Sequence, residues 1–316
     1  MSSRNNNPKG ILFILTGMAL FSVQDSLIKY IFEDTALYEL YFGRTLTALI
    51  LLALYLKITS QKLVMKTYYP LLTTVRVICF FFGFSFFYIS LTYMSLAMAN
   101  ALFFSSPFFI SILAIVFLGE KVGIRRWLAI IVGFLGVYIV LNPNFENFDY
   151  TKLAPVACAL FYAISMTITK ITSDKDSVYS QMFHLYIGAI GISIIFFIFT
   201  GKGQFNTFSD PTLQFILREW FTNPYYSWPY IIIMGVVASL SFYFVFSAYS
   251  IASPSVVSLF EYSLIIWAII IGYILFDNIP TLRTFVGVTL IIGAGIYIYI
   301  REKARDQMIV TDTPNR

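Results

Sequence analysis

Long apolar runs separated by short polar segments follow one another along the chain and predict ten membrane-spanning helices. The core of a bilayer is about 30 Å thick, which requires roughly 20 apolar residues per helix. The expected spans are residues 10–32, 36–56, 71–94, 97–118, 125–142, 151–172, 179–201, 229–250, 254–276 and 281–300. The predicted fold class is therefore an all-α integral membrane protein with ten transmembrane helices.

The loops between these runs differ in their lysine and arginine content. With the N-terminus in the cytoplasm, fourteen of the 21 basic residues fall in cytoplasmic segments, four fall in external segments and three lie within spans. Lys and Arg are enriched in the cytoplasmic loops of membrane proteins. Both termini are therefore predicted to be cytoplasmic, and the expected location in a bacterium is the inner (plasma) membrane.

The longest predicted loop, residues 202–228, is external in this topology. Its last part and the start of the next span are rich in aromatic residues, from Trp220 to Tyr230. The segment is either an interfacial aromatic belt that anchors the protein in the bilayer or a lid over the transport path.

The two halves of the chain resemble each other. The segment that begins at Tyr93 matches the one that begins at Tyr249, and an offset of about 157 residues pairs Glu120 with Asp277. Each half holds five predicted spans, and because five is odd, the second copy enters the membrane from the opposite side. Inverted repeats of this kind are typical of alternating-access transporters. The expected organisation is a first repeat over residues 1–145, a second over residues 146–303 and a cytoplasmic tail over residues 304–316.

Composition agrees with a membrane location and excludes several classes of function. Hydrophobic residues make up 59% and charged residues 12% of the chain, whereas soluble proteins carry about 25% charged residues. The net charge of +5 is explained by the cytoplasmic loops, so nucleic acid is not an expected partner. Cys79 and Cys158 both lie in apolar runs, so neither a disulfide nor a metal site is expected from them.

Sequence motifs of membrane enzymes are missing from the chain. It contains no HExxH, DDxxD or GxSxG motif and no phosphate-binding P-loop, and its one histidine is His184. Enzymatic activity and direct use of ATP are therefore not expected, and neither is a cofactor or a metal.

An ordered set of short patterns resembles the EamA family of the drug/metabolite transporter superfamily. The patterns extend over about residues 10–303 and include DSLIK from Asp25, ELYFGR from Glu39, LGE ending at Glu120, RRW from Arg125 and Asn142-Pro143. The second half resembles a subgroup that includes carriers of S-adenosylmethionine and related organic ions, on Tyr262-Ser263, Trp267, Gly272-Tyr273 and Pro280. The resemblance implies a ten-helix, two-repeat carrier. Glu261 departs from that subgroup, in which a neutral or basic residue is expected.

Four ionisable residues lie in the predicted outer parts of the first two spans. Asp25 and Lys29 are four residues apart and share a helix face. Glu39 and Arg44 lie at a similar depth in the next span. A charge within a span costs about 2.5–3.5 kcal/mol on insertion scales and needs a partner, water or a substrate. The four residues form either an outer gate or substrate clamp, or an ion-pair cluster that holds two helices together.

The predicted inner half carries Arg76, His184 and Glu261. Glu261 lies about seven residues into the ninth span, roughly 11 Å from its start. It is a candidate proton-coupling carboxylate, a counter-ion for a cationic substrate, or a salt-bridge partner of Arg76 or His184. Arg76 lies a few residues into its span and either extends to the lipid headgroups or has a binding or gating role. His184 either relays protons or forms a hydrogen bond across helices.

Aromatic residues and one amide complete the candidate site. The rings that the family resemblance places on cavity-lining spans are Tyr93, Tyr162, Tyr243, Tyr262 and Trp267. Asn100 is a further polar candidate on the fourth span. Aromatic rings beside a carboxylate suit an ammonium or sulfonium group, through cation–π attraction of about 0.5–2 kcal/mol each. The alternative is that these rings pack against other helices or face lipid.

The sequence therefore predicts a secondary active transporter that moves a small polar metabolite across the inner membrane by alternating access. The expected substrate is a cationic or zwitterionic amine or amino-acid-like compound. The alternative is a proton-coupled exporter of amino acids or drugs, with Glu261 as the proton-handling carboxylate. Expected partners are the substrate, the lipid bilayer and, if transport is coupled, a proton or another ion. The chain is expected to be a monomer or a homodimer.

Overall fold

Helices lie over all ten of the predicted apolar runs. The computed structural model describes residues 6–31, 34–61, 63–94, 96–141, 153–276 and 281–311. Within these ranges, eight helical segments are long and apolar enough to cross a membrane, with Ala99–Leu118 counted as one of them across a short turn, and Pro254–Trp267 is a shorter apolar stretch. The chain is thus an all-helical, multi-pass membrane protein over its described residues, while the count of ten spans stays a prediction.

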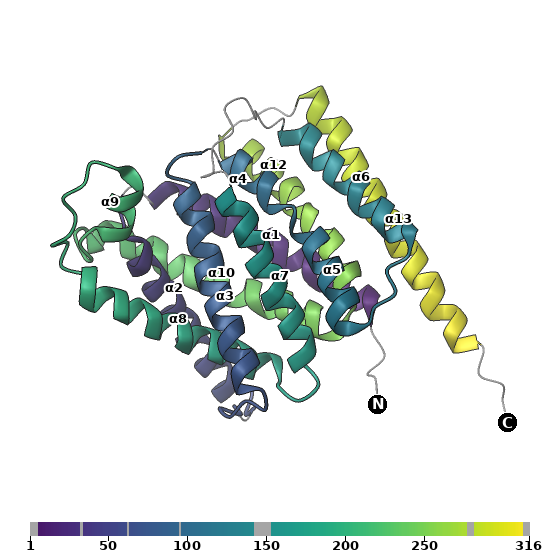
Figure 1. The fold of residues 1–316 in the computed structure, drawn as a ribbon, viewed down its shortest axis with the longest axis horizontal. Helices are drawn as coiled ribbons and strands as arrows, with labels where there is room; N and C mark the ends of the chain where they lie inside the picture. The colour runs from purple at the N-terminus through teal and green to yellow at the C-terminus, as the bar shows by residue number, and fades with distance from the viewer. Residues whose placement is uncertain are drawn as a thin grey trace.

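The helices divide into two successive groups along the chain (Figure 1). The first group consists of α1 (Asn7–Ile31), α2 (Leu37–Ile58), α3 (Pro70–Ser90), α4 (Leu96–Phe103), α5 (Ser106–Leu118) and α6 (Ile124–Leu141). The second consists of α7 (Ala154–Thr172), α8 (Val178–Thr200), α9 (Pro211–Leu217), α10 (Pro224–Ile251), α11 (Pro254–Val257), the 3₁₀ helix η2 (Ser258–Tyr262), α12 (Ser263–Phe276) and α13 (Leu282–Thr311).

The predicted fourth and ninth spans are each broken near the middle. The fourth consists of α4 and α5, which are separated at Phe104 and Ser105, and Pro107 occupies the first turn of α5. Proline lacks a backbone N–H and clashes with the preceding turn, so a continuous helix through this point is disfavoured. The ninth passes from α11 through η2 into α12. The two breaks fall at equivalent positions of the two halves. Interrupted helices are a common feature of transporter folds.

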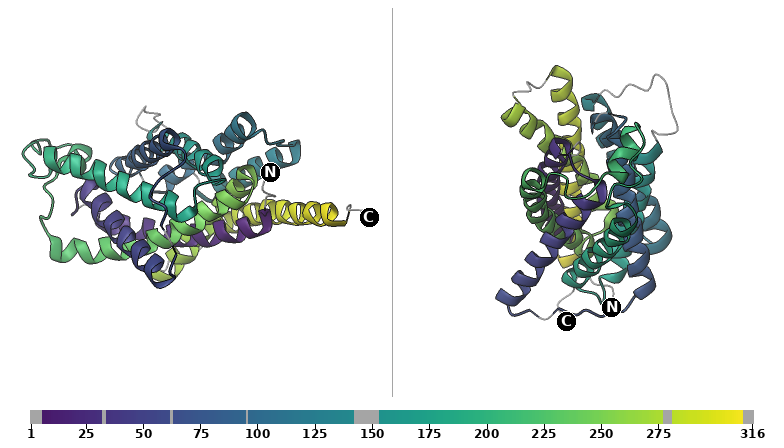
Figure 2. Two further views of the ribbon diagram at one scale, coloured as in Figure 1. Left: turned by 90° about the horizontal axis from the view of Figure 1, so that it is seen from below. Right: turned by 90° about the vertical axis from the view of Figure 1, so that its left-hand side faces the viewer.

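The two groups of helices interleave instead of forming separate bundles. Helix α1 packs along α10 and α3 packs along α7, and these pairs are equivalent if the halves are two copies of one unit. The contact of α5 with α7 likewise has its counterpart in the contact of α12 with α1. Helices α6 and α13 pair with each other at one side of the molecule, and α13 extends beyond the bundle (Figures 1 and 2). This pattern is what two related, exchanged halves produce.

The pair of α6 and α13 is held at a glycine crossing. A Cβ atom at Gly136 would lie 2.7 Å from the carbonyl oxygen of Gly287, and one at Gly287 would lie 2.5 Å from the carbonyl oxygen of Gly136. Such backbone-to-backbone approach is possible only without side chains, and it is a common device for helix association in lipid. The two glycines therefore set the distance between these helices.

The long connection between α8 and α10 packs on the bundle at one point and is exposed at another. Trp220 is 5% exposed and lies against Phe42 and Phe197. Tyr225, in the first turn of α10 directly after this connection, is by contrast 95% exposed. The aromatic segment is thus divided between a contact with the protein and an outward face that suits the bilayer interface.

Candidate functional site

A small cavity lies among helices from both halves of the chain. Its volume is about 40 Å³, which leaves room for about three water molecules. The cavity is lined by Met18, Phe21 and Asp25 of α1, Phe84 and Phe87 of α3, Asn100 and Phe103 of α4, Tyr162 of α7 and Leu264 of α12. Three of the predicted site residues thus come together here: Asp25, Asn100 and Tyr162.

Aromatic rings that contact one another form a wall of this cavity. The Phe103 ring lies 5.5 Å from that of Tyr162 and 5.7 Å from that of Phe87, centre to centre. Phe84 contacts both Phe103 and Tyr162, at 6.3 and 6.1 Å. Asp25, half-buried on α1, is the carboxylate among the lining residues. The cavity therefore combines one acidic group with several ring faces.

Glu261 lies beside this cavity and is almost completely buried, with 1% of its surface exposed. Its Oε1 accepts hydrogen bonds from the hydroxyls of Tyr249 at 2.5 Å and Tyr162 at 2.7 Å, and its Oε2 accepts one from Ser106 at 3.2 Å. Tyr162 belongs to both groups, since its ring lines the cavity and its hydroxyl binds Glu261. Tyr162 thus connects the Glu261 carboxylate to the cavity, which the carboxylate itself does not line.

Arg76 and His184 contact other partners. Arg76 donates to the side-chain oxygen of Gln181 at 2.6 Å and to its backbone oxygen at 3.1 Å. The two ring nitrogens of His184 lie 2.6 Å from the carbonyl oxygen of Ser180 and 2.9 Å from that of Met65. The structure brings neither side chain to Glu261, and the salt-bridge interpretation of Glu261 has no geometric support.

Among the outer ionisable residues whose side chains the structure describes, Arg44 and Glu39 make separate contacts. Arg44 is 2% exposed and donates to the hydroxyl of Tyr88 at 3.1 Å. It also lies within electrostatic reach of Asp25. Glu39 instead accepts a hydrogen bond of 2.9 Å from the indole nitrogen of Trp228. The side chain of Lys29 lies outside the described residues.

Replacing Trp228 by phenylalanine is expected to lower the free energy of unfolding by about 1.5–3 kcal/mol. The substitution removes a donor from Glu39, a carboxylate that is only 3% exposed, and hydrogen bonds to buried charged groups have this magnitude. Thermal unfolding in detergent measures the change. Trp127→Phe, on α6, removes the same group elsewhere and serves as the control. Equal stability losses in the two variants would contradict the prediction.

The other predicted aromatic residues lie away from the cavity. Tyr262 is fully buried against Gly133 and its hydroxyl lies 3.4 Å from the backbone oxygen of Ile130. Tyr243 stacks on Tyr179 and lines a second cavity, of about 370 Å³, between α2, α8 and α10. The remaining two are Trp267, which packs on the apolar core, and Tyr93, which is 39% exposed.

Sequence reasoning missed the phenylalanines that line the cavity. Phe84 and Phe87 are three residues apart and therefore share one face of α3. This spacing was a usable signal, but 33 phenylalanines occur in the chain and apolar faces turned to lipid have the same periodicity. Position on the helix face alone could not separate the two environments.

Comparison of the sequence with models of known protein families identifies the family of this chain. The model of the EamA-like transporter family matches residues 8–142 and again residues 152–300. The chain belongs to the EamA-like transporter family. It is therefore a small-molecule transporter and not an enzyme, and each of its halves is one family unit.

Named relatives of this EamA protein are transporters. An S-adenosylmethionine uptake transporter of Rickettsia conorii is 26% identical over 294 residues, which is 93% of each chain. A riboflavin transporter of Vibrio cholerae is 26% identical over 309 residues, covering 94% of this chain and 95% of its own. A solved crystal structure with 14% identity superimposes with a TM-score of 0.72 and covers 90% of this chain and 95% of that one. That likeness concerns the fold.

Proposed function

We propose that this EamA protein is a secondary active carrier for a small metabolite that bears a cationic amine or sulfonium group, including zwitterionic and amino-acid-like compounds. The single observation that carries the proposal is the cavity that Asp25 lines together with Phe84, Phe87 and Phe103. A carboxylate supplies a counter-charge, and ring faces attract cations. The substrate binds between the two halves of the chain.

The named relatives narrow the choice of substrate for this site. S-adenosylmethionine carries a sulfonium, an ammonium and a flat purine ring, which match Asp25 and the aromatic wall together. Riboflavin offers a flat ring without a cationic group and uses the aromatic wall alone. The acidic residue therefore favours the S-adenosylmethionine class, and riboflavin is the second candidate.

Alternating access accounts for the size of the cavity. A volume of about 40 Å³ is far below the 300–1,000 Å³ of sites for drug-sized ligands. The conformation described is thus contracted around the site, and binding requires the halves to move apart. Inverted repeats supply two conformations of similar energy for this motion. The basic loops support cytoplasmic termini and an inner-membrane location.

A proton-coupled exporter is the alternative mechanism, with Glu261 as the group that handles the proton. The hydroxyl of Tyr162 supports it, because it joins the buried Glu261 carboxylate to the cavity. In this mechanism Tyr162 couples the two sites, because its ring lines the substrate cavity and its hydroxyl binds the carboxylate that takes up the proton. Transport by inverted vesicles at several imposed pH gradients distinguishes this mechanism from uncoupled exchange.

Asp25→Asn tests the substrate proposal. Purified wild type is expected to be stabilised against heat by S-adenosylmethionine, because a ligand that binds the folded state shifts unfolding by mass action. Loss of the carboxylate should weaken this affinity by about 10- to 100-fold, the equivalent of about 1.5–3 kcal/mol. Any affinity for riboflavin should change little.

Asp34→Asn is the matched control, because Asp34 is exposed, lies in the turn after α1 and does not line the cavity. Its affinity for S-adenosylmethionine should equal that of wild type. Equal affinity of the Asp25→Asn variant and wild type for the cation would refute the role of Asp25. Binding of riboflavin in place of S-adenosylmethionine would refute the cationic class.

A further inference from the structure

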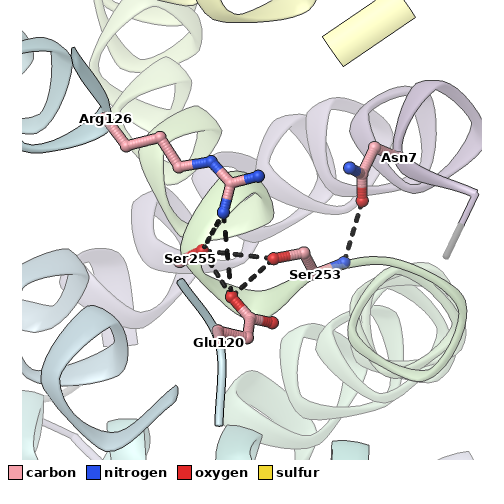
Figure 3. Close-up of polar contacts among 5 residues, drawn as sticks. All are labelled: Asn7, Glu120, Arg126, Ser253 and Ser255. Atoms are coloured by element: carbon pink, nitrogen blue, oxygen red, sulfur yellow. Dashed lines mark hydrogen bonds and ion pairs between the residues drawn. The ribbon is translucent and has the colours of Figure 1, made fainter. Parts of the chain in front are cut away.

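A compact polar cluster joins three separate parts of the chain (Figure 3). The carboxylate oxygen Oε2 of Glu120 accepts hydrogen bonds from Ser253 at 2.6 Å and from Ser255 at 2.5 Å. Arg126 donates to the Ser255 hydroxyl at 3.0 Å, and its guanidinium lies 4.0 Å from the same carboxylate oxygen. The backbone N–H of Ser253 donates to the side chain of Asn7 at 2.9 Å.

The members of this cluster come from elements that belong to different halves. Asn7 begins α1, Glu120 and Arg126 flank the turn between α5 and α6, and the serines flank the start of α11. The side chains of Glu120 and Arg126 are 13% and 9% exposed. Hydrogen bonds to a charged group in such a shielded position are stronger than those between neutral groups. The cluster therefore ties the first half of the chain to the second.

The cluster and the cavity lie at different depths in the membrane. Along α1, Asp25 is 18 residues beyond Asn7, which corresponds to about 27 Å. Glu261 is seven residues beyond Pro254, or about 11 Å at helical rise. The order along the bundle is thus the cluster, then Glu261 with its three hydroxyl donors, then the cavity. The positive-inside pattern predicts that the end with the cluster is cytoplasmic.

We propose that Glu120, Ser253 and Ser255 form the cytoplasmic gate of the transport path, with Arg126 and Asn7 as positioning residues. The gate is closed in this structure, and it holds the α5–α6 turn against the start of the interrupted ninth span. Opening toward the cytoplasm requires that the serine hydroxyls leave the Glu120 carboxylate. Water then hydrates the charge, so the separated state is accessible at a moderate cost.

The first repeat lacks the two serines of this cluster, so the same gate is not expected at the opposite end of the transport path. At the offset that aligns Tyr93 with Tyr249, Ser253 and Ser255 correspond to Ala97 and Ala99. Alanine cannot donate a hydrogen bond from its side chain. The serine–carboxylate contact is therefore a property of one copy, and the opposite end of the path closes by other contacts.

Cysteine labelling in oriented vesicles tests the gate. Leu264 lines the cavity, so Leu264→Cys in a background with Cys79→Ala and Cys158→Ala places one thiol there. A membrane-impermeant thiol reagent is added to inside-out vesicles, in which the cytoplasmic face is outward. Ser253→Ala with Ser255→Ala is expected to raise the labelling rate about tenfold or more, because two charge-assisted hydrogen bonds of the closed state are lost. Glu120→Gln should act in the same direction.

The control and the outcomes separate a gate from a general loosening of the fold. Glu219 is an exposed acidic residue in the connection after α9, so Glu219→Gln repeats the chemical change without touching the cluster and should leave the rate unchanged. Unchanged labelling in the serine variant overturns the proposal. So does an equal rise from both faces of the membrane, which shows loosening. Although the inference rests on the proposed carrier function, the labelling needs no substrate, so failure of the Asp25 experiment leaves it intact.

Discussion

Replacing Glu261 by alanine is expected to lower the free energy of unfolding by about 3–5 kcal/mol, a large share of the stability of a typical protein. The substitution leaves the hydroxyls of Tyr162, Tyr249 and Ser106 without their shared acceptor. It also opens a hole at a position that is 1% exposed. Thermal and chemical unfolding in detergent measure the loss.

Two further variants show whether the hydroxyl contacts cause the effect. Glu261→Gln retains the side-chain volume and one acceptor oxygen, so its loss should be about 1–2 kcal/mol. Tyr249→Phe removes the 2.5 Å hydrogen bond, whereas Tyr262→Phe removes a hydroxyl whose contact with Ile130 is 3.4 Å long. Tyr249→Phe should be the more damaging of the pair. A fully stable Glu261→Ala variant would show that the carboxylate has no structural role.

Replacing Gly136 by leucine is expected to separate α6 from α13 and to destabilise the protein by about 3 kcal/mol, the upper end of the usual cost of overpacking. The nearest obstacle is the backbone oxygen of Gly287, 2.7 Å from the position of the new Cβ atom. Backbone cannot move aside as a side chain can, so the helices themselves must shift. Detergent stability and the yield of folded protein measure the result.

Gly293→Leu is the matched control on α13. No atom lies within 4 Å of a Cβ atom at Gly293, and the residue is exposed. Leucine there should be neutral or slightly stabilising, because glycine disfavours helix. If both variants were equally stable, the glycine crossing would not be what sets the helix distance.

The helices themselves were predictable because lipid imposes a simple rule on each segment. Within the bilayer every backbone polar group must be satisfied by its own helix, so a long apolar run has one outcome. The same rule explains the weak point of the prediction. The run from residue 97 to 118 was expected as one helix but is broken at Phe104 and Ser105. A hydropathy profile does not detect such a break, because the residues on both sides of it are apolar. Pro107, two residues after Ser105, is the local sequence signal for it.

The candidate site was only partly predictable. The rarity of charges in spans identified Asp25 and Glu261 as residues that need partners. Hydropathy does not say which partners, since that depends on how each helix is rotated about its axis. Glu261 therefore received three interpretations, and the three hydroxyls around it were in none of them. The cavity wall of Phe84, Phe87 and Phe103 was missed for the same reason.

The sequence by itself determined that this chain is a membrane protein built from two related halves, because apolar length and internal similarity can be read one segment at a time. Family membership follows from the same linear information, as the two matches over residues 8–142 and 152–300 show. Only the tertiary structure decided that Asp25 lines the cavity, that Glu261 binds hydroxyls beside it and that Glu120 meets Ser253. These contacts join residues far apart in the chain, and they depend on the rotation and tilt that many weak side-chain contacts set together.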